Sequence, residues 1–510
     1  MDAGPVSSHP PDAARLADVL TGELPPAACY RLLAARDVRF DGRFFVGVTS
    51  TGIFCRPICP APTPKAHNCT FWRSAAAAQA AGFRPCLRCR PEAAPGTPAW
   101  RGTGATVSRA LRLIEGGALD GAGSVADLAA RLGIGDRHLR RLFDRHLGTN
   151  PAAVARLRRV LFAKQLLDET RLPMTEVALA AGFTSQRRFN ACLREVYGQP
   201  PSALRRARRL GAAKAGPLRL SLPYRPPFAW DALVGFLRGR AIPGVESVDG
   251  ARYARAMRVG DGVATVRVAN EPERSRLGVE VVLEGTHALF DVARRLRRLF
   301  DLEADPVSID DALGRVRSLA RHVQAVPGVR VPGAVDGFET AVRAVLGQQV
   351  SVKGATTISG RIVERFGTPL PARLVSDDAV RALFPTPETL VEAPLETVGL
   401  PRARAETIRG LAAAVLERPS LLDPAPALDD AIADWSALRG IGPWTAHYVA
   451  MRVLGEPDGL PVGDLGLRKA LAQKRAVEPV SSGEVEKRLE PCRPYRAYAA
   501  LRLWDGLGGG

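Results

Sequence analysis

The stretch Leu438-Arg-Gly-Ile-Gly-Pro-Trp-Thr-Ala446 places two glycines, Gly440 and Gly442, in a tight turn between segments with helical spacing of apolar residues. Glycine at such a turn lets backbone amides approach a phosphate without obstruction by a side chain. The stretch therefore predicts two helices joined by a hairpin that contacts the DNA backbone, with carbonyl groups that could hold a monovalent cation. Such hairpins occur in proteins with and without catalysis, so a second feature must supply the chemistry.

That feature is an aspartate, Asp464, which lies within Leu460-Pro-Val-Gly-Asp-Leu-Gly-Leu467 and follows Gly442 by 22 positions. The spacing allows one helix and a loop, which would return the carboxylate to the side of the hairpin. An aspartate before an apolar run is commonly a helix N-cap. Its combination with the hairpin favours a catalytic role.

The hairpin and Asp464 together resemble the helix-hairpin-helix glycosylase superfamily, and residues 218–505 resemble its AlkA-type 3-methyladenine glycosylases. The other segments that carry this resemblance are Pro226-Pro-Phe-Ala-Trp230, Gly235-Phe-Leu237, Tyr253-Ala-Arg255, Arg298-Leu-Phe-Asp-Leu302, Pro332-Gly-Ala-Val-Asp-Gly-Phe-Glu339, Leu346-Gly-Gln-Gln-Val-Ser-Val352 and Arg496-Ala-Tyr-Ala499. The resemblance implies that an alkylated purine is flipped out of the duplex and that its positive charge favours stacking on aromatic rings.

The same resemblance implies roles for individual residues. Asp464 would stabilise an oxocarbenium-like sugar and could activate water as the glycosidic bond breaks. Gln349 takes the position of the side chain that fills the gap left by the flipped base. The aromatic residues that match the base pocket, each of which alone would more often be a core residue, are Phe236, Trp444, Tyr448 and Trp504.

Several positions depart from related patterns. Gln349 is polar where an apolar wedge is expected, and Leu465 replaces an aromatic residue after the aspartate, so the range of lesions could differ. Bifunctional relatives carry a hairpin lysine where this chain has Trp444, which argues against strand cleavage. Iron–sulfur relatives need four clustered C-terminal cysteines, but only Cys492 lies there, and it lacks the Pro-Cys-His-Arg motif of alkylguanine transferases.

Two close cysteine pairs occur near the other end of the chain, as Cys55-x3-Cys59 and Cys86-x2-Cys89. Four converging thiolates are the natural tetrahedral ligand set for one zinc ion, and such sites are structural by default. Nearby cations would help to hold the thiols as thiolates. These cations are Arg56, Arg84, Arg88 and Arg90.

The segments Thr51-Gly-Ile-Phe-Cys-Arg-Pro-Ile-Cys59 and Ala81-Gly-Phe-Arg-Pro-Cys-Leu-Arg-Cys89 resemble the N-terminal domain of Ada-type methyltransferases. The resemblance implies that Cys55 takes a methyl group from a methylphosphotriester in DNA. It also implies that Thr51 and Arg84 contact DNA, whereas Pro62 stands where an arginine would be expected.

Two basic helix-turn-helix patterns lie between residues 105 and 206. In the first, Ser124 caps a helix, Gly133-Ile-Gly forms the turn and Asp136 caps a second helix; a long helix over residues 151–168 then leads to the second copy. The phrase Ala180-Ala-Gly-Phe-Thr-Ser-Gln-Arg-Arg-Phe189 resembles AraC-type DNA-binding domains. The residues expected to enter the major groove are Arg137, Arg140, Arg141, Gln186, Arg187 and Arg188. A plain helical bundle with solvated arginines is the alternative.

The whole chain predicts a multidomain α+β protein. Its 510 residues exceed one core, and the formal charge of +19 suits a polyanionic partner, although an arginine-rich composition could also reflect codon bias. No apolar run is long enough for a transmembrane helix and no export pattern precedes the cysteines, so we expect a cytoplasmic, nucleoid-associated protein without a membrane partner. The predicted units are 25–93 (zinc), 105–206 (helix-turn-helix), 218–302 (an α+β subdomain with strands) and 305–510 (the helical glycosylase core), with linkers at 91–104 and 211–217.

These patterns favour a DNA alkylation-repair protein that excises alkylated purines, accepts methyl groups at Cys55 and regulates transcription with double-stranded DNA and RNA polymerase as partners. One alternative is a transcription regulator whose C-terminal half only binds DNA. Another is a zinc-stabilised architectural DNA-binding protein.

Overall fold

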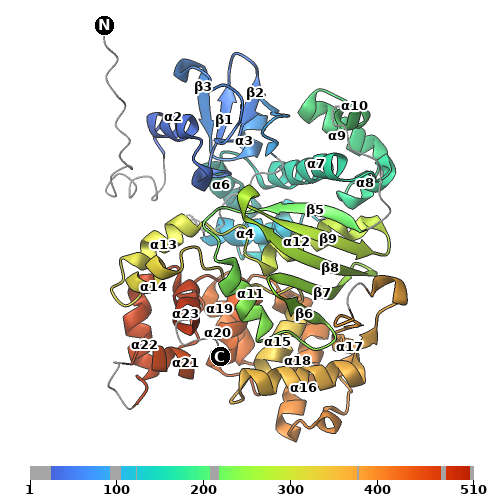
Figure 1. The fold of residues 1–510 in the computed structure, drawn as a ribbon, viewed down its shortest axis with the longest axis vertical. Coiled ribbons are helices and arrows are strands. Elements are labelled where there is room, and N and C mark those ends of the chain that lie inside the picture. Colours follow the sequence, from blue (N-terminus) through green and yellow to red (C-terminus); the bar gives the residue numbers. More distant parts are fainter. Residues whose placement is uncertain are drawn as a thin grey trace.

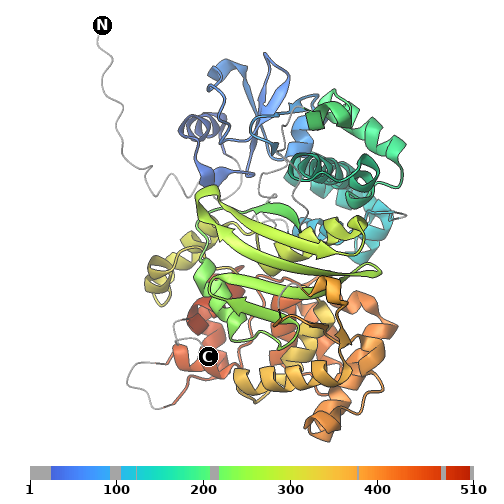
Figure 2. The same ribbon diagram turned by 45° about the vertical axis from the view of Figure 1, so that its right-hand side comes forward.

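A computed structural model describes residues 24–91, 105–121, 123–206, 217–375, 378–472 and 478–505. Figures 1 and 2 show the N-terminal unit and most of the helix-turn-helix unit above a β-sheet layer, with the C-terminal helices below it. This arrangement confirms the predicted multidomain α+β class. The predicted linkers fall almost wholly outside the described residues.

The N-terminal unit is a four-stranded sheet in the order β3-β1-β2-β4, flanked by two helices. Its elements are α2 (Pro26–Ala35), β1 (Phe45–Val48), β2 (Ile53–Cys55), β3 (Cys69–Trp72), α3 (Ala75–Ala80) and β4 (Arg84–Pro85). Phe45 and Phe54 pack edge to face beneath α3, with ring centroids 5.9 Å apart. Because β2 and β4 pair in parallel, the residues that follow each strand lie side by side.

In its described residues, 105–121 and 123–206, the helix-turn-helix unit contains helices and turns but no strand. The helices are α4 (Ala105–Glu115), α5 (Val125–Arg131), α6 (Asp136–Leu147), α7 (Pro151–Glu169), α8 (Met174–Ala180), α9 (Gln186–Tyr197) and α10 (Pro201–Arg206). Ser124 and Asp127 form a capping box at the start of α5, as the sequence predicts for Ser124. Asp136, however, is the first residue of α6 and Gly135 is its N-cap, so the predicted cap was one residue out.

The central sheet is antiparallel, in the order β5-β9-β8-β7-β6. Its strands are β5 (Leu218–Pro223), β6 (Glu246–Asp249), β7 (Arg252–Val259), β8 (Gly262–Glu271) and β9 (Arg276–Leu283). Alternating apolar residues of β8 and β9 share one core with α11 (Trp230–Arg238), α12 (Leu289–Leu299) and parts of the helix-turn-helix unit. The sheet therefore joins the helix-turn-helix unit to the C-terminal half.

Where the structure describes it, the C-terminal unit is helical apart from the short strands β10 (Thr368–Pro369) and β11 (Ala382–Leu383). Its helices are α13 (Pro306–Gly314), α14 (Ala320–Ala325), α15 (Gly337–Leu346), α16 (Val352–Phe366), α17 (Pro387–Leu390), α18 (Arg402–Glu417), α19 (Leu428–Ser436), α20 (Pro443–Arg452), α21 (Leu465–Ala470), α22 (Ser482–Leu489) and α23 (Arg496–Asp505). The predicted hairpin joins α19 to α20.

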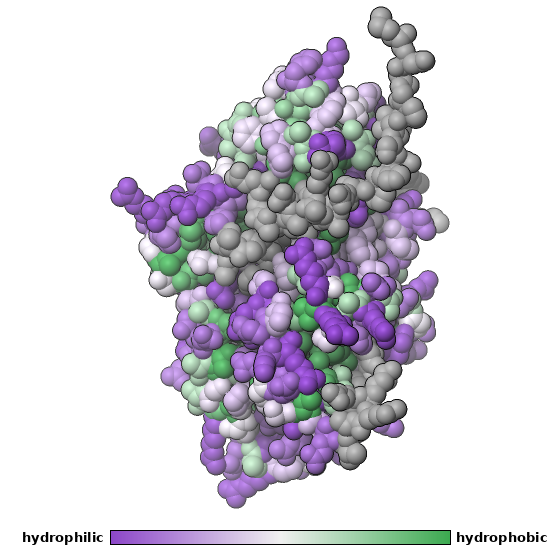
Figure 3. Space-filling view, turned by 90° about the vertical axis from the view of Figure 1, so that its left-hand side faces the viewer, coloured by the Kyte–Doolittle hydropathy of each residue, from purple (hydrophilic) through white to green (hydrophobic). Residues whose placement is uncertain are grey.

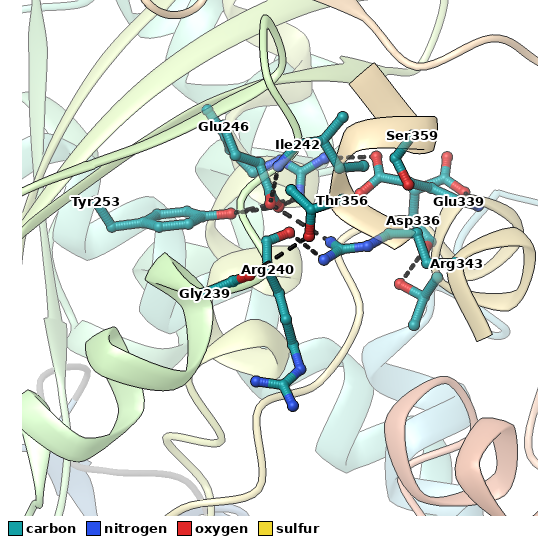
Figure 4. A network of polar contacts seen from close by, with 12 residues as sticks. Gly239, Arg240, Ile242, Glu246, Tyr253, Asp336, Glu339, Arg343, Thr356 and Ser359 are labelled. Carbon is teal, nitrogen blue, oxygen red and sulfur yellow. Dashed lines mark hydrogen bonds and ion pairs between the residues drawn. The ribbon is translucent and has the colours of Figure 1, made fainter. Parts of the chain in front are cut away.

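A buried polar network connects this unit to the sheet (Figure 4). Arg255 of β7 bonds Glu246 of β6 at 2.7 Å and Glu339 of α15 at 2.8 Å, and all three side chains are at most 4% exposed. Moving any one of these buried charged groups away from its partner would leave an uncompensated charge in the core, so the network holds the three side chains in place. The network sets the orientation of α15 relative to the sheet.

Hydrophilic residues cover much of the face shown in Figure 3, with hydrophobic residues in smaller patches among them. Among the described residues, none of the helices combines the length and the apolar content required to cross a bilayer.

Candidate functional sites

Asp464 lies at the centre of a set of three hydrogen-bond donors. It is the N-cap of α21, and its Oδ1 accepts the backbone N–H of Leu467 at 2.9 Å. Trp444 Nε1 donates to Oδ2 at 3.1 Å, and Trp504 Nε1 donates to Oδ1 at 2.8 Å. The residue therefore caps a helix and also contacts two of the predicted pocket aromatics. The N-cap role and the catalytic role that the sequence suggests for Asp464 are therefore compatible.

Three of the predicted pocket aromatics form a continuous set of rings. Trp444 and Tyr448 lie one turn apart on α20 and stack with centroids 5.4 Å apart and planes inclined by 13°. Tyr448 and Trp504 lie 6.4 Å apart at 49°. Since Trp444 and Tyr448 contact each other directly, a flipped base would have to stack on an outer face of the set.

The fourth aromatic, Phe236 of α11, is covered by two cations that the sequence analysis missed. The guanidinium carbons of Arg240 and Arg452 lie 3.8 Å and 4.9 Å from its ring centroid. Arg452 Nη1 also donates to Tyr448 Oη at 2.7 Å. The pattern that could have revealed them is the spacing of four residues in Phe236–Arg240 and Tyr448–Arg452.

These cations change the electrostatics of the ring set. Burial favours the neutral phenol, but the positive charges of Arg452, Arg240 and Arg343 outweigh it and lower the pKa of Tyr448. Arg343 bonds the carbonyl oxygen of Arg240 and also pairs with Glu246. In Figure 4 the guanidinium of Arg240 points away from the Glu246 carboxylate. The ring set is therefore positive on this side.

The two hairpin glycines, Gly440 and Gly442, lie in different surroundings. Gly440 has φ +82°, and a Cβ there would lie 2.1 Å from Thr407 Oγ1, so a side chain is excluded by the protein itself. Gly442 has φ −92°, caps α20, and a Cβ there would meet no atom within 4 Å. Nothing inside the protein demands glycine at 442, which agrees with the close approach of an external phosphate.

Gln349, the predicted gap-filling residue, directly follows Gln348, whose side chain bonds residues of the hairpin and of α20. Gln348 Nε2 donates to Gly440 O at 3.0 Å and to Thr445 Oγ1 at 2.9 Å. Gln349 itself is exposed and has φ +55°, in the left-handed region. Leu465, which follows the aspartate, is also 53% exposed. The sequence analysis missed the contact made by Gln348, because nothing local pairs residue 348 with residue 440.

The four predicted cysteines converge, with their Sγ atoms all within 4.8 Å of one another. The parallel pairing of β2 with β4 places Cys55 beside Cys86. Cys55 is half-buried, whereas Cys59, Cys86 and Cys89 are buried. Four sulfur ligands at this spacing fit a tetrahedral zinc ion.

The arginines near the cysteine cluster have distinct partners. The backbone N–H of Arg56 donates to Cys89 Sγ at 3.3 Å, and its side chain pairs with Asp41. Thr51 and Arg84, the predicted DNA contacts, are exposed. A Cβ on Gly198 would lie 3.1 Å from Arg84 Nη1, so this guanidinium rests against the C-terminal end of α9.

The predicted groove-contacting residues lie at the N-terminal parts of α6 and α9, opposite the buried face of each helix. Leu139 and Phe143 of α6 and Phe189 and Leu193 of α9 are fully buried. The exposed residues are Arg137, Arg140, Arg141, Gln186, Arg187 and Arg188.

Four family models match consecutive parts of the chain. They are the metal-binding domain of Ada (28–92), a helix-turn-helix domain (128–207), the AlkA N-terminal domain (219–336) and the HhH-GPD superfamily base excision DNA repair protein (342–494). The probable bifunctional transcriptional activator/DNA repair enzyme AlkA of Mycobacterium tuberculosis (strain H37Rv) is 42% identical over 485 residues, covering 94% of this chain and 96% of the relative. The chain belongs to this family.

Members of this AlkA-type bifunctional family combine regulatory and repair domains in one chain, and the domains here fit alkylation repair and its regulation. DNA-3-methyladenine glycosylase 2 of Escherichia coli is 32% identical over 287 residues, 56% of this chain and 96% of the relative. The bifunctional transcriptional activator/DNA repair enzyme Ada of the same species is 32% identical over 176 residues, 34% of this chain and 48% of that relative.

A solved structure supports the fold of the C-terminal half. A 3-methyladenine DNA glycosylase from Archaeoglobus fulgidus superimposes with a TM-score of 0.50 and 24% identity, covering 57% of this chain and 98% of its own. The family resemblances predicted from the sequence are thus confirmed, together with the fold class. The match to the metal-binding domain of Ada and the four converging cysteines both indicate a zinc site.

Proposed function

We propose that the C-terminal half hydrolyses the glycosidic bond of alkylated purines of the 3-methyladenine class, with Asp464 as its catalytic carboxylate. The observation that carries the proposal is the pair of indole N–H groups, one on each oxygen of Asp464, which hold a carboxylate beside an aromatic ring set and the DNA-binding hairpin. The names of two similar proteins, DNA-3-methyladenine glycosylase 2 of Escherichia coli and DNA-3-methyladenine glycosylase of Bacillus subtilis, support the same substrate class.

The chemistry follows from charge. As the bond to the base lengthens, positive charge develops on the sugar, and a fixed carboxylate stabilises that charge without reorganising. The base leaves, water adds to the sugar, and an abasic site remains. Because the hairpin carries Trp444 rather than a lysine, no Schiff base forms there and the strand is left intact.

The deciding assay measures release of 3-methyladenine and 7-methylguanine from alkylated duplex DNA. We expect Asp464→Asn to lose at least about a hundredfold in single-turnover rate, since the main charge on the sugar is removed. The matched control is Asp423→Asn, an exposed aspartate of the same unit. Equal rates for Asp464→Asn and wild type would leave DNA binding by this half as the better account.

We also propose that Cys55 accepts methyl groups from DNA methylphosphotriesters. It is the most exposed thiol of the cluster, so it is the one that a phosphate methyl can reach. A bound zinc ion would keep the thiol deprotonated and nucleophilic. Cys55 Sγ attacks the methyl carbon, the carbon–oxygen bond breaks, and the phosphodiester anion leaves.

Mass spectrometry after incubation with methylated DNA tests this step. One methyl group should appear on Cys55, and Cys55→Ser should gain none. Cys69, a partly exposed thiol outside the cluster, is the internal control. Methylation of Cys69 in place of Cys55 would contradict the assignment.

We propose further that this methylation controls transcription. A methylated Cys55 loses a negative charge, which weakens repulsion from DNA phosphates. Promoter binding by α6 and α9 should therefore tighten after methylation, most strongly at low salt, and recruit RNA polymerase. An unchanged dissociation constant for promoter DNA would refute the link.

A monovalent cation at the carbonyl groups of the hairpin stays a prediction. Replacing K+ with a large organic cation and measuring DNA binding tests it.

A further inference from the structure

A buried ion pair joins the helix-turn-helix unit to the C-terminal unit. Arg109 of α4 donates from Nε and Nη2 to the two carboxylate oxygens of Glu456 at 3.0 Å and 3.1 Å, and Arg112 Nη2 adds a bond of 3.0 Å. Arg109 is 8% exposed and Glu456 3% exposed. A bidentate, desolvated pair of this kind fixes direction as well as distance.

Helix α4 is an integral part of the helix-turn-helix unit, which we also call the regulatory unit. Its residues Ala110, Leu113 and Ile114 are buried in one core with Leu139 and Phe143 of α6. Arg109 also donates to the carbonyl oxygen of Pro426 at 2.9 Å, just before α19. Figure 1 places α4 behind the sheet, close to the C-terminal helices. Because α4 shares this core, the Arg109–Glu456 ion pair depends on the position of the whole helix-turn-helix unit.

Glu456 lies in the loop that leads from α20 to Asp464, which we call the 453–463 loop. Gly455 precedes it at φ +69°, and a Cβ there would lie 2.9 Å from Arg112 Nη1. A cavity of about 420 Å³, lined in part by Arg112, Gly455 and Glu456, adjoins the pair. The loop thus has space to shift if the ion pair is lost.

The same loop is joined to the helix that carries Trp504. Ala497 N donates to Pro457 O at 2.8 Å, and Arg496 pairs with Asp458 at 2.7 Å, so the start of α23 is fixed to the two residues after Glu456. Trp504, near the end of α23, donates to Asp464. Arg109, Glu456, α23 and Asp464 form one connected set of contacts.

We propose that Glu456 is a positioning residue for the glycosylase reaction and that Arg109 and Arg112 make the regulatory unit a working part of the repair site. The inference rests on the proposed function of Asp464. Removal of the pair releases the 453–463 loop and moves the carboxylate, and a misplacement of about 1 Å can cost about a hundredfold in rate. DNA affinity, which depends on the hairpin, is unaffected.

The experiment compares full-length Glu456→Gln, Arg109→Met and Arg109→Lys, each with zinc bound, in single-turnover release of 7-methylguanine. We expect Glu456→Gln and Arg109→Met to slow release 10- to 100-fold, and Arg109→Lys, which keeps the charge, to recover part of it. Affinity for duplex DNA with an abasic-site analogue should stay within twofold of wild type.

Arg131→Met is the matched control, because Arg131 and Asp423 form an exposed ion pair between the same two units that does not include Glu456, although both residues line the same cavity. Rates within twofold of wild type in folded Glu456→Gln and Arg109→Met would overturn the proposal, as would an equal loss in Arg131→Met. If Glu456→Gln fails to fold, as judged by its melting curve, the two Arg109 variants decide. An inactive wild type would instead contradict the proposed function itself.

Discussion

Trp504 and Asp464 are 40 positions apart, yet the indole Nε1 of one lies 2.8 Å from Oδ1 of the other. Trp444 Nε1 approaches Oδ2 at 3.1 Å from a different helix. Each carboxylate oxygen therefore has its own indole donor, from α20 and from α23. The orientation of Asp464 depends on how these two helices pack rather than on α21 alone.

Replacing Trp504 by Phe should slow base release about 10- to 100-fold, because a hydrogen bond to a charged group contributes about 1.5–3 kcal/mol. The ring itself remains, so affinity for abasic-site DNA should change little. Single-turnover rates and binding titrations measure the two effects separately.

Trp230→Phe is the control for Trp504→Phe. Its Nε1 donates to Ala251 O at 3.0 Å, so it loses a comparable bond at a distance from Asp464. An equal loss of rate in both variants would show that the effect is one of general stability.

The two hairpin glycines should respond differently to alanine. Gly440→Ala introduces both a left-handed alanine and a contact with Thr407, and should lower the free energy of unfolding by about 1–3 kcal/mol. Gly442→Ala should leave stability within about 0.5 kcal/mol, since its Cβ would meet no atom within 4 Å, and should weaken DNA binding if a phosphate approaches this turn as we propose. Denaturation curves and DNA titrations on both variants check this contrast, and equal destabilisation would refute it.

Arg240 should influence which bases are released. Its charge lies 3.8 Å from the Phe236 centroid and opposes a cationic base nearby. Arg240→Met should raise release of cationic 7-methylguanine relative to neutral hypoxanthine by about tenfold. Arg238→Met, an exposed arginine at the end of α11 and two residues before Arg240, is the control. An unchanged ratio would mean that the cation does not face the bound base.

Asp301 should make stability depend on pH. Burial raises its pKa from 3.8 to about 6, although Arg330 and a hydrogen bond from Tyr498 oppose the rise. The folded protein thus binds this proton more tightly than the unfolded chain, and stability falls as pH rises from about 4 to about 6.

Asp301→Asn removes this dependence. The replacement tolerates the left-handed backbone at φ +49°. Relative to wild type, the variant should gain about 3 kcal/mol in unfolding free energy between pH 4 and pH 7. Urea midpoints of both proteins across this range measure the difference, and parallel curves would disprove the assignment.

Local spacing determined much of this protein. The Gly440-Ile-Gly442 turn, the aspartate 22 positions later, the paired cysteines and the two helix-turn-helix patterns were all predicted from residues close together in sequence. Glycine turns, caps and ligand pairs act over a few residues, so their physical consequences are contained in the sequence around them. The position of Asp464 was predicted in the same way.

Only the tertiary structure decided what surrounds that carboxylate. Trp504 bonds it across 40 positions, Gln348 reaches Gly440 across 92, and Arg109 reaches Glu456 across 347. Such contacts depend on which faces of distant helices pack together, and burial rather than local propensity selects those faces. The sequence by itself determined which aspartate follows the hairpin at this spacing, and the packing of α4, α20 and α23 decided how its carboxylate is held.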